Sequence, residues 1–116
     1  MGPPQPVTVG RVAKALGLSA CVSANLDAEI AGAQVSDLLS YVMAEGKRGQ
    51  VWITIQTHPN IVAVAGLAGM HAIILAGGFS PEPETVARAE EEEMGLFVSA
   101  ETAYSLAGKL YEMGVR

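Results

Sequence analysis

Two short apolar segments, Val51–Ile55 and Ala72–Leu75, constrain the fold of this chain more than any other feature. Neither alternates apolar and polar residues as a strand with one solvated face does, so each predicts a strand buried on both faces. A segment expected to form a helix separates the two strands, and further expected helices lie before and after them. Because buried strands that alternate with helices form parallel sheets, we expect an α/β fold: a mostly parallel sheet of about 4–5 strands with helices on its faces.

The expected helices are recognised by their first and last residues. Ser36-Asp37 can cap a helix that ends at Gly46. Another helix is expected to begin near Pro59. Although Asn60–Ala65 also has strand propensity, the proline and the short distance to the next strand favour a helix. The remaining elements are expected as helices that begin at Ser80-Pro81-Glu82 and Ser99-Ala100-Glu101, and a short strand at Leu96–Val98.

The amino-terminal part of the chain predicts shorter elements. Residues 1–6 are rich in proline and are expected to be flexible, which leaves one domain over residues 7–116. Thr8 can cap a helix that ends near Leu16. Short strands are then expected at Ser19–Ser23 and Glu29–Val35, joined by a polar turn.

The composition narrows the classes of function. Half of the 116 residues are hydrophobic, and the net charge is −5 with only 7 Lys and Arg. Nucleic-acid binders carry a basic patch, so we expect no nucleic-acid partner. The sequence shows no signal peptide or membrane span, so we also expect no membrane partner. The single Cys21 rules out an intramolecular disulfide and fits a reducing compartment, which predicts a cytoplasmic protein.

The segment Thr57-His58-Pro59-Asn60 joins the first buried strand to an uncharged helix. Pro59 suits a first helical turn, and the backbone amides that follow it then point towards the carboxyl end of the strand. Parallel sheets bind ligands at this edge, and helix N-termini attract anions. We therefore interpret Thr57, His58 and Asn60 as candidate ligands of a phosphate or carboxylate. Alternatively, these residues only satisfy the backbone of the turn.

A comparison of the acids near the starts of the expected helices supports the anion hypothesis. Each of them carries an acid near its start that can compensate the positive end of the helix. The helix after Asn60 carries none in its first turn. The acids of the other helices are Asp37, Glu82 with Glu84, and Glu101.

A second candidate segment, Ala76-Gly77-Gly78-Phe79-Ser80, follows the second buried strand. Paired glycines permit positive φ and a close backbone approach to a ligand. The segment is neither GxGxxG nor GxxxxGK[ST], which excludes the dinucleotide and P-loop motifs. Because the carboxyl ends of parallel strands share one edge, we expect Gly77, Gly78 and Ser80 to lie at the same edge as the first segment and to contribute to ligand binding. Alternatively, they form only a tight loop.

The sequence predicts no catalytic or metal site. His58 and His71 are the only histidines, and neither is spaced with acidic or cysteine residues as a metal site requires. We find no pair of catalytic carboxylates and no nucleophile with a base, and we expect no catalytic residue, metal or cofactor. General acid–base catalysis by His58 is the alternative.

Two helices carry more apolar surface than the sheet can cover. The segment Asn60–Ala68 is apolar on every side, and the last helix carries two apolar stripes. We expect a homodimer, although a larger complex explains the pattern equally well.

The run from Val35 to Ser40, followed by Val51–Ala65 and by Ile73–Gly78 with a later proline and helix, resembles the DRTGG domain. The similarity is greatest to its small stand-alone members, the iron-only hydrogenase-associated type. It spans about Val7 to Val115 and is most specific over residues 35–78. The resemblance implies a single compact domain similar to the HPr kinase N-terminal-like fold, commonly dimeric and without catalysis of its own.

The chain departs from the residues for which that family is named. Where many members have an acidic-basic pair after the strand, this chain has Thr57-His58-Pro59, and Thr-Gly-Gly is replaced by Ala76-Gly77-Gly78. Backbone contacts with a ligand survive such changes better than side-chain contacts do. The sequence thus predicts a non-catalytic regulatory or interaction domain, a homodimer that senses a small anionic metabolite or nucleotide. The alternative is a structural accessory subunit of a hydrogenase-type redox complex, with a redox protein as partner and no ligand.

Overall fold

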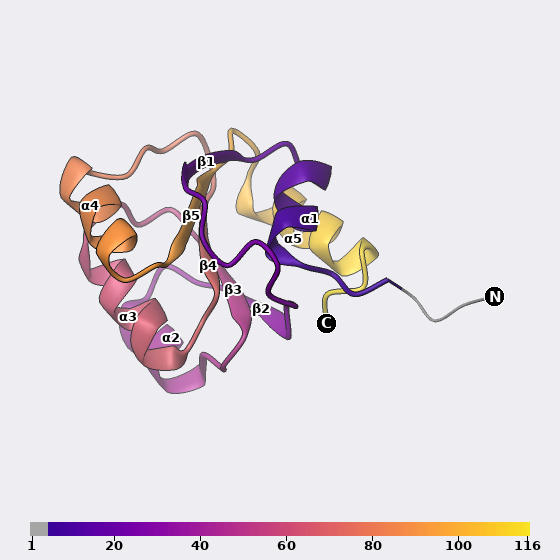
Figure 1. Cartoon of the computed structure of the whole chain (residues 1–116), viewed down its shortest axis with the longest axis horizontal. Helices are drawn as coiled ribbons and strands as arrows, with labels where there is room; N and C mark the ends of the chain where they lie inside the picture. The colour runs from indigo at the N-terminus through magenta and orange to yellow at the C-terminus, as the bar shows by residue number, and fades with distance from the viewer. Residues whose placement is uncertain (1–4) are drawn as a thin grey trace.

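A five-stranded sheet forms the centre of the computed structural model, which describes residues 5–116 (Figure 1). The strands follow the order β1-β5-β4-β3-β2 across the sheet. The elements along the chain are α1 (Val9–Ala15), β1 (Ser19–Val22), β2 (Gly32–Val35), α2 (Leu39–Glu45), β3 (Gln50–Thr54), α3 (Asn60–Ala68), β4 (Ala72–Leu75), α4 (Pro83–Glu91), β5 (Gly95–Val98) and α5 (Ala103–Glu112). The predicted α/β class is confirmed.

The sheet is mostly parallel, as predicted. Strands β2, β3, β4 and β5 pair as parallel neighbours, so that Ile53 lies opposite Val35 on one side and Ile74 on the other. Strand β1 pairs antiparallel with β5, and its register shifts between Ala20 and Val22. The four parallel strands therefore end at one common edge, while β1 begins at that edge.

Strands β3 and β4 are buried along their whole lengths because they separate two cores. Val51, Ile53 and Ile74 pack in a core with α1 and α5. Trp52 and Ile73 pack on the opposite face with α2, α3 and α4. Figure 1 shows the same division, with α1 and α5 on one side of the sheet and the other helices on the far side. The continuous apolar runs in the sequence reflect side chains that alternate between these two cores.

The first two strands differ from the prediction. Strand β2 is limited to Gly32–Val35, and Glu29 forms only an isolated bridge with Thr8. Strands β1 and β2 lie at opposite edges of the sheet, so the turn between them does not close a hairpin. The polar turn predicted between them is present. The chain after it crosses to the other edge of the sheet, because β1 pairs with β5 and β2 pairs with β3.

The amino-terminal helix agrees with the prediction. The side chain of Thr8 accepts a hydrogen bond from the amide of Arg11, and the helix runs to Ala15 with Leu16 as its C-cap. The flexible segment predicted over residues 1–6 lies in part outside the described residues, which begin at Gln5. The carbonyl oxygens of Gln5 and Pro6 accept hydrogen bonds from the Arg11 guanidinium.

Three helices begin later than their predicted starts. Helix α3 begins at Asn60 as expected, but α2, α4 and α5 begin three or four residues after the predicted serines. Two of these serines instead hold turns: Ser36 Oγ accepts from the amide of Leu38, and Ser99 Oγ accepts from that of Glu101. Local hydrogen bonds to the nearest amides compete with capping, and the serine pattern alone does not distinguish the two.

Some apolar side chains of the outer helices are exposed. Leu67 of α3 is 76% exposed, and Tyr104 and Tyr111 of α5 are 90% and 61% exposed. A Cβ added at Gly66 or Gly108 would meet no atom within 4 Å, so neither glycine is required by packing within this chain. Within residues 5–116, no helix is both long enough and apolar enough to cross a membrane.

Gly95 in β5 and Gly108 in α5 form a matched pair for testing this packing. A Cβ at Gly95 would lie 3.0 Å from both the Ala24 carbonyl oxygen and Ala72 Cβ. Gly95→Ala should therefore lower the free energy of unfolding by about 1–3 kcal/mol through overpacking. Gly108→Ala should raise it by about 0.5–1 kcal/mol through helix propensity. Urea denaturation followed by far-UV circular dichroism measures both changes, and a neutral Gly95→Ala would contradict the close approach in β5.

Candidate functional site

The loops that follow the four parallel strands lie together at the carboxyl edge of the sheet, which we call the rim (residues 36–38, 55–59, 76–82 and 99–102). Backbone hydrogen bonds join neighbouring loops. The amide of Gly78 donates to the Ser99 carbonyl oxygen at 2.9 Å, and that of Glu82 donates to the Thr57 carbonyl oxygen at 3.2 Å. The prediction that the histidine and diglycine segments share one edge is confirmed.

The first candidate segment is internally satisfied. The amide of Asn60 donates to His58 Nδ1 at 3.1 Å. The amides of Ile61 and Val62 donate to the carbonyl oxygens of His58 and Pro59 at 3.2 and 3.1 Å. The expectation of unoccupied amides at this helix end is therefore wrong, because the His58 side chain and the tightened first turn supply the acceptors. His58 is exposed, and since its Nδ1 accepts, its Nε2 is the ring nitrogen that can donate to a ligand.

The prediction that the helix after Asn60 differs from its neighbours by lacking an acid in its first turn is also wrong. Helix α4 carries Glu84 in its first turn, whereas α2 and α5 carry no acid there, like α3. Asp37 and Glu101 lie before their helices. Asp37 accepts hydrogen bonds from Thr54 and Ile55, and Glu101 accepts them from Ser105 and Lys109. The absence of an acid thus does not distinguish α3, and the error follows directly from the misplaced starts of α2 and α5.

Thr57 connects two loops of the rim through its backbone. Its carbonyl oxygen accepts from the hydroxyl of Thr85 at 2.6 Å and from the amide of Glu82. Thr85 belongs to α4 and is fully buried. The link fixes the start of α4 against the loop after β3, a role that no pattern in the sequence indicates.

The diglycine segment adopts the conformation for which glycine is suited. Gly77 and Gly78 have φ of +76° and +80°. Their amides donate to the carbonyl oxygens of Glu101 and Ser99, so they tie the loop after β4 to the loop after β5. Gly78 and Ser80 are exposed, and a Cβ at Gly78 would meet no atom within 4 Å. The segment is thus a structural link whose outer surface stays accessible.

Asp37 supports the rim in a way that the capping interpretation missed. Its Oδ1 accepts from the hydroxyl of Thr54 at 2.8 Å and from the amide of Ile55 at 2.9 Å. Its carbonyl oxygen accepts from the side chain of Gln56 at 3.0 Å. Thr54 is buried, so this carboxylate satisfies a polar group inside the core as well as the end of β3.

Substitution of Asp37 tests this support. Asp37→Ala leaves the buried Thr54 hydroxyl and the Ile55 amide without their acceptor, and should lower the free energy of unfolding by about 1–3 kcal/mol. Asp37→Asn keeps a side-chain oxygen at the same place and should cost less than half as much. Urea denaturation of the two variants measures the difference. Equal losses would show that the charge, and not the acceptor, is what matters.

An open depression lies at one end of the rim, where α1 ends and β1 begins. Its volume is about 390 Å³. The lining residues are Leu16, Gly17, Ser19, Gly78, Phe79, Ser80, Val98, Ser99, Ala100 and Glu101. Two of the predicted site residues, Gly78 and Ser80, line it, whereas Thr57, His58, Asn60 and Gly77 do not. The rim thus brings the predicted residues to one edge but not into one cavity.

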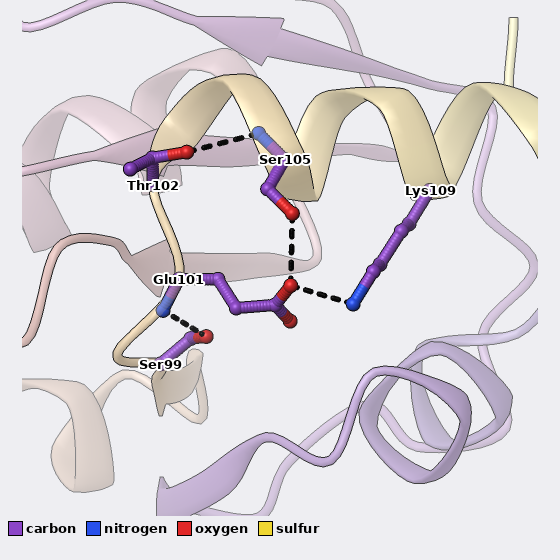
Figure 2. A network of polar contacts seen from close by, with 5 residues as sticks. All are labelled: Ser99, Glu101, Thr102, Ser105 and Lys109. Carbon is purple, nitrogen blue, oxygen red and sulfur yellow. Dashed lines mark hydrogen bonds and ion pairs between the residues drawn. The ribbon is translucent and has the colours of Figure 1, made fainter.

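Glu101 is the charged group of this depression and is held by α5. Its Oε1 accepts from Ser105 Oγ at 2.8 Å and from Lys109 Nζ at 2.5 Å, as Figure 2 shows. The Thr102 side chain caps the same helix by accepting from the amide of Ser105. The hydrogen bonds from Lys109 and then Ser105 lower the pKa of Glu101, so it is a carboxylate at neutral pH.

Within residues 5–116, no three His, Cys, Asp or Glu side chains are grouped as a metal site requires. Cys21 is partly buried, and this burial raises the pKa of its thiol. His71 lies at the start of β4, at the edge opposite the rim, where its carbonyl oxygen accepts from the Asn25 side chain at 2.9 Å.

Comparison with known proteins identifies the fold. No family model and no curated protein matches this chain. A solved structure is similar over 88% of the chain with a TM-score of 0.66 and 12% sequence identity. It contains the CBS and DRTGG domains of the regulatory region of Clostridium perfringens pyrophosphatase, complexed with the activator diadenosine tetraphosphate. This chain spans 45% of the length of that one. The similarity supports a DRTGG-type fold, in agreement with the resemblance found in the sequence.

Proposed function

We propose that this chain is a non-catalytic regulatory or interaction domain that binds a small ligand at the rim. The proposal depends chiefly on one observation: the loops after all four parallel strands meet at one edge, beside an open depression. Ligands of open α/β sheets bind at this edge. The similar solved structure comes from a regulatory region and not from a catalytic domain, which favours regulation over catalysis.

The proposed ligand is a small anionic metabolite or a nucleotide. The activator in the similar structure is a dinucleoside tetraphosphate, which supports a ligand of this class. The proposed contacts are Thr57, His58, Asn60, Gly77, Gly78 and Ser80. Several amides of the two loops, among them those of Asn60, Gly77 and Gly78, are already bonded within the chain. His58 Nε2 and the exposed Ser80 hydroxyl are side-chain donors that an anion can use.

Thermal denaturation with added ligands tests this binding. AMP, ATP, diadenosine tetraphosphate and acetyl phosphate are added singly, and at least one should raise Tm, since a ligand at 100 times its Kd stabilises the folded state by about 2.7 kcal/mol. His58→Ala and Gly78→Val should reduce that rise. His71→Gln, a change in the histidine at the opposite edge, is the control and should preserve it. If none of the ligands shifts Tm, the sensing role is wrong.

We also propose that the chain forms a homodimer in a reducing cytoplasm. Leu67 on α3 and Tyr104 on α5 leave large apolar groups in water on opposite faces of the sheet, and an interface between two copies would cover one of these faces. The alternative is a larger assembly, such as an accessory subunit of a hydrogenase-type redox complex. The exposed acidic run Glu90–Glu93 at the end of α4 offers such a partner a charged contact surface.

Sedimentation equilibrium distinguishes these two assemblies. The purified chain should sediment as a dimer. Of Leu67→Glu on the α3 face and Tyr104→Glu on the α5 face, the one that lies in the interface should shift the chain towards the monomer by placing a charge there. Glu90→Gln changes an exposed charge away from both apolar side chains and is the control. A monomeric wild-type chain that responds to no ligand would contradict the dimer and favour the accessory-subunit alternative.

A further inference from the structure

We propose that the depression beside α1 binds the uncharged nucleoside part of a ligand, with a vicinal diol on Glu101 and a planar base against Phe79. This inference rests on the proposed function, because it assigns a ligand class to one end of the rim. The volume of the depression is about 390 Å³, which falls in the range of small-ligand pockets, roughly 300–1,000 Å³.

The carboxylate of Glu101 is prepared to accept hydrogen bonds from a ligand. Lys109 and Ser105 both donate to Oε1, and no donor among residues 5–116 contacts Oε2. Figure 2 shows the side chain fixed along the flank of α5 by these two contacts, with the second oxygen pointing away from the helix. A carboxylate held in this way has lost little freedom when a ligand arrives, and it accepts the paired hydroxyl donors of a ribose. The same chemistry lets an acidic residue recognise ribose in dinucleotide-binding folds.

The charge of the depression argues for an uncharged ligand part. None of its lining residues is Lys or Arg, and Glu101 is the only charged one. A phosphate placed inside would therefore face this carboxylate, and the cation beside it, Lys109, is paired with Glu101 and does not line the depression. A cationic ligand has little advantage either, because Lys109 already pairs with Glu101 at 2.5 Å. The Ser19, Ser80 and Ser99 hydroxyls supply neutral donors and acceptors around the same space.

The apolar wall of the depression suits a planar ring. Phe79 is 49% exposed although it follows a buried strand, and it lines the depression together with Leu16 and Val98. Its position is defined by the diglycine turn, since a Cβ at Gly77 would lie 3.3 Å from the ring. An exposed aromatic ring stacks on any base, so this contact provides affinity without selecting one base.

Calorimetric titration with adenosine, 2′-deoxyadenosine and AMP tests the assignment. Adenosine should bind, 2′-deoxyadenosine should bind roughly tenfold more weakly because one donor to a carboxylate is lost, and AMP should bind no more tightly than adenosine. In Glu101→Gln, the discrimination between adenosine and 2′-deoxyadenosine should largely disappear. This loss of coupling reports the diol contact itself and not a general change in stability.

Two further variants separate this contact from the folding of the α5 flank. Ala100→Phe adds a ring at the wall without altering the Glu101 hydrogen bonds, and it should weaken adenosine binding at least tenfold. His71→Gln lies at the opposite edge of the sheet and should leave it unchanged. Circular dichroism confirms that each variant is folded before titration.

The possible outcomes also separate this inference from the proposed function. Equal affinity of the wild-type chain for adenosine and 2′-deoxyadenosine overturns the diol contact. A response to acetyl phosphate that is lost in His58→Ala, with no binding of adenosine, overturns this inference and keeps the proposed function. The absence of binding by every nucleoside, nucleotide and acyl phosphate overturns both.

Discussion

The arrangement of the molecule depends on parallel pairing between strands that are buried on both faces. Strands β3 and β4 have no solvated side, so helices must cover both faces of the sheet, and each connection must cross over from one end of a strand to the other. The loops that leave these strands consequently meet at one edge. The hydrogen bonds from Ala76 to the Thr54 carbonyl oxygen and from Ser99 to that of Leu75 extend the strand ladder into these loops. The location of the rim is therefore a property of the sheet and not of any single motif.

The polar residues of the rim mainly hold its loops together. Asp37 satisfies the end of β3, the Thr57 carbonyl oxygen holds the start of α4, and the diglycine amides bind the loop after β5. Groups that remain outward for a ligand include the second oxygen of Glu101, the Ser80 hydroxyl and His58 Nε2. The amides of Asn60, Ile61 and Val62, which the sequence suggests for an anion, are instead bonded within the chain.

The sequence predicted the elements that packing alone determines. Strands β3 and β4 and the start of α3 follow from continuous apolar runs and one proline, and the structure contains each of them. The starts of α2, α4 and α5 were misplaced because Ser, Asp and Glu near a helix end can serve the helix, the turn or a neighbouring strand with the same local pattern. Asp37 binds the end of β3 instead of capping α2 because its carboxylate accepts a hydrogen bond from Thr54, which is distant in sequence.

The depression could not be predicted because it joins distant parts of the chain. Leu16 lies in the α1–β1 connection and Ser19 begins β1, whereas Phe79 and Glu101 follow β4 and β5. Their proximity requires β1 to pair antiparallel with β5, and the apolar pattern of a short edge strand does not specify its partner. Gly78 and Ser80 were identified because a diglycine turn is visible in the sequence. The pattern Ser99-Ala100-Glu101 predicts a helix cap, and it does not indicate the contact of Glu101 with Lys109 two turns later.

The environment of Trp52 gives the molecule an internal optical reporter. Its indole is fully buried in β3, and its Nε1 donates to the Ser36 carbonyl oxygen at 2.8 Å, directly below the rim. Since the chain contains one tryptophan, all indole emission arises from this position. Any rearrangement that draws the β2–α2 junction away from the sheet exposes this N–H to water and moves the emission to longer wavelength. Motions of this part of the rim can thus be followed in the unlabelled protein.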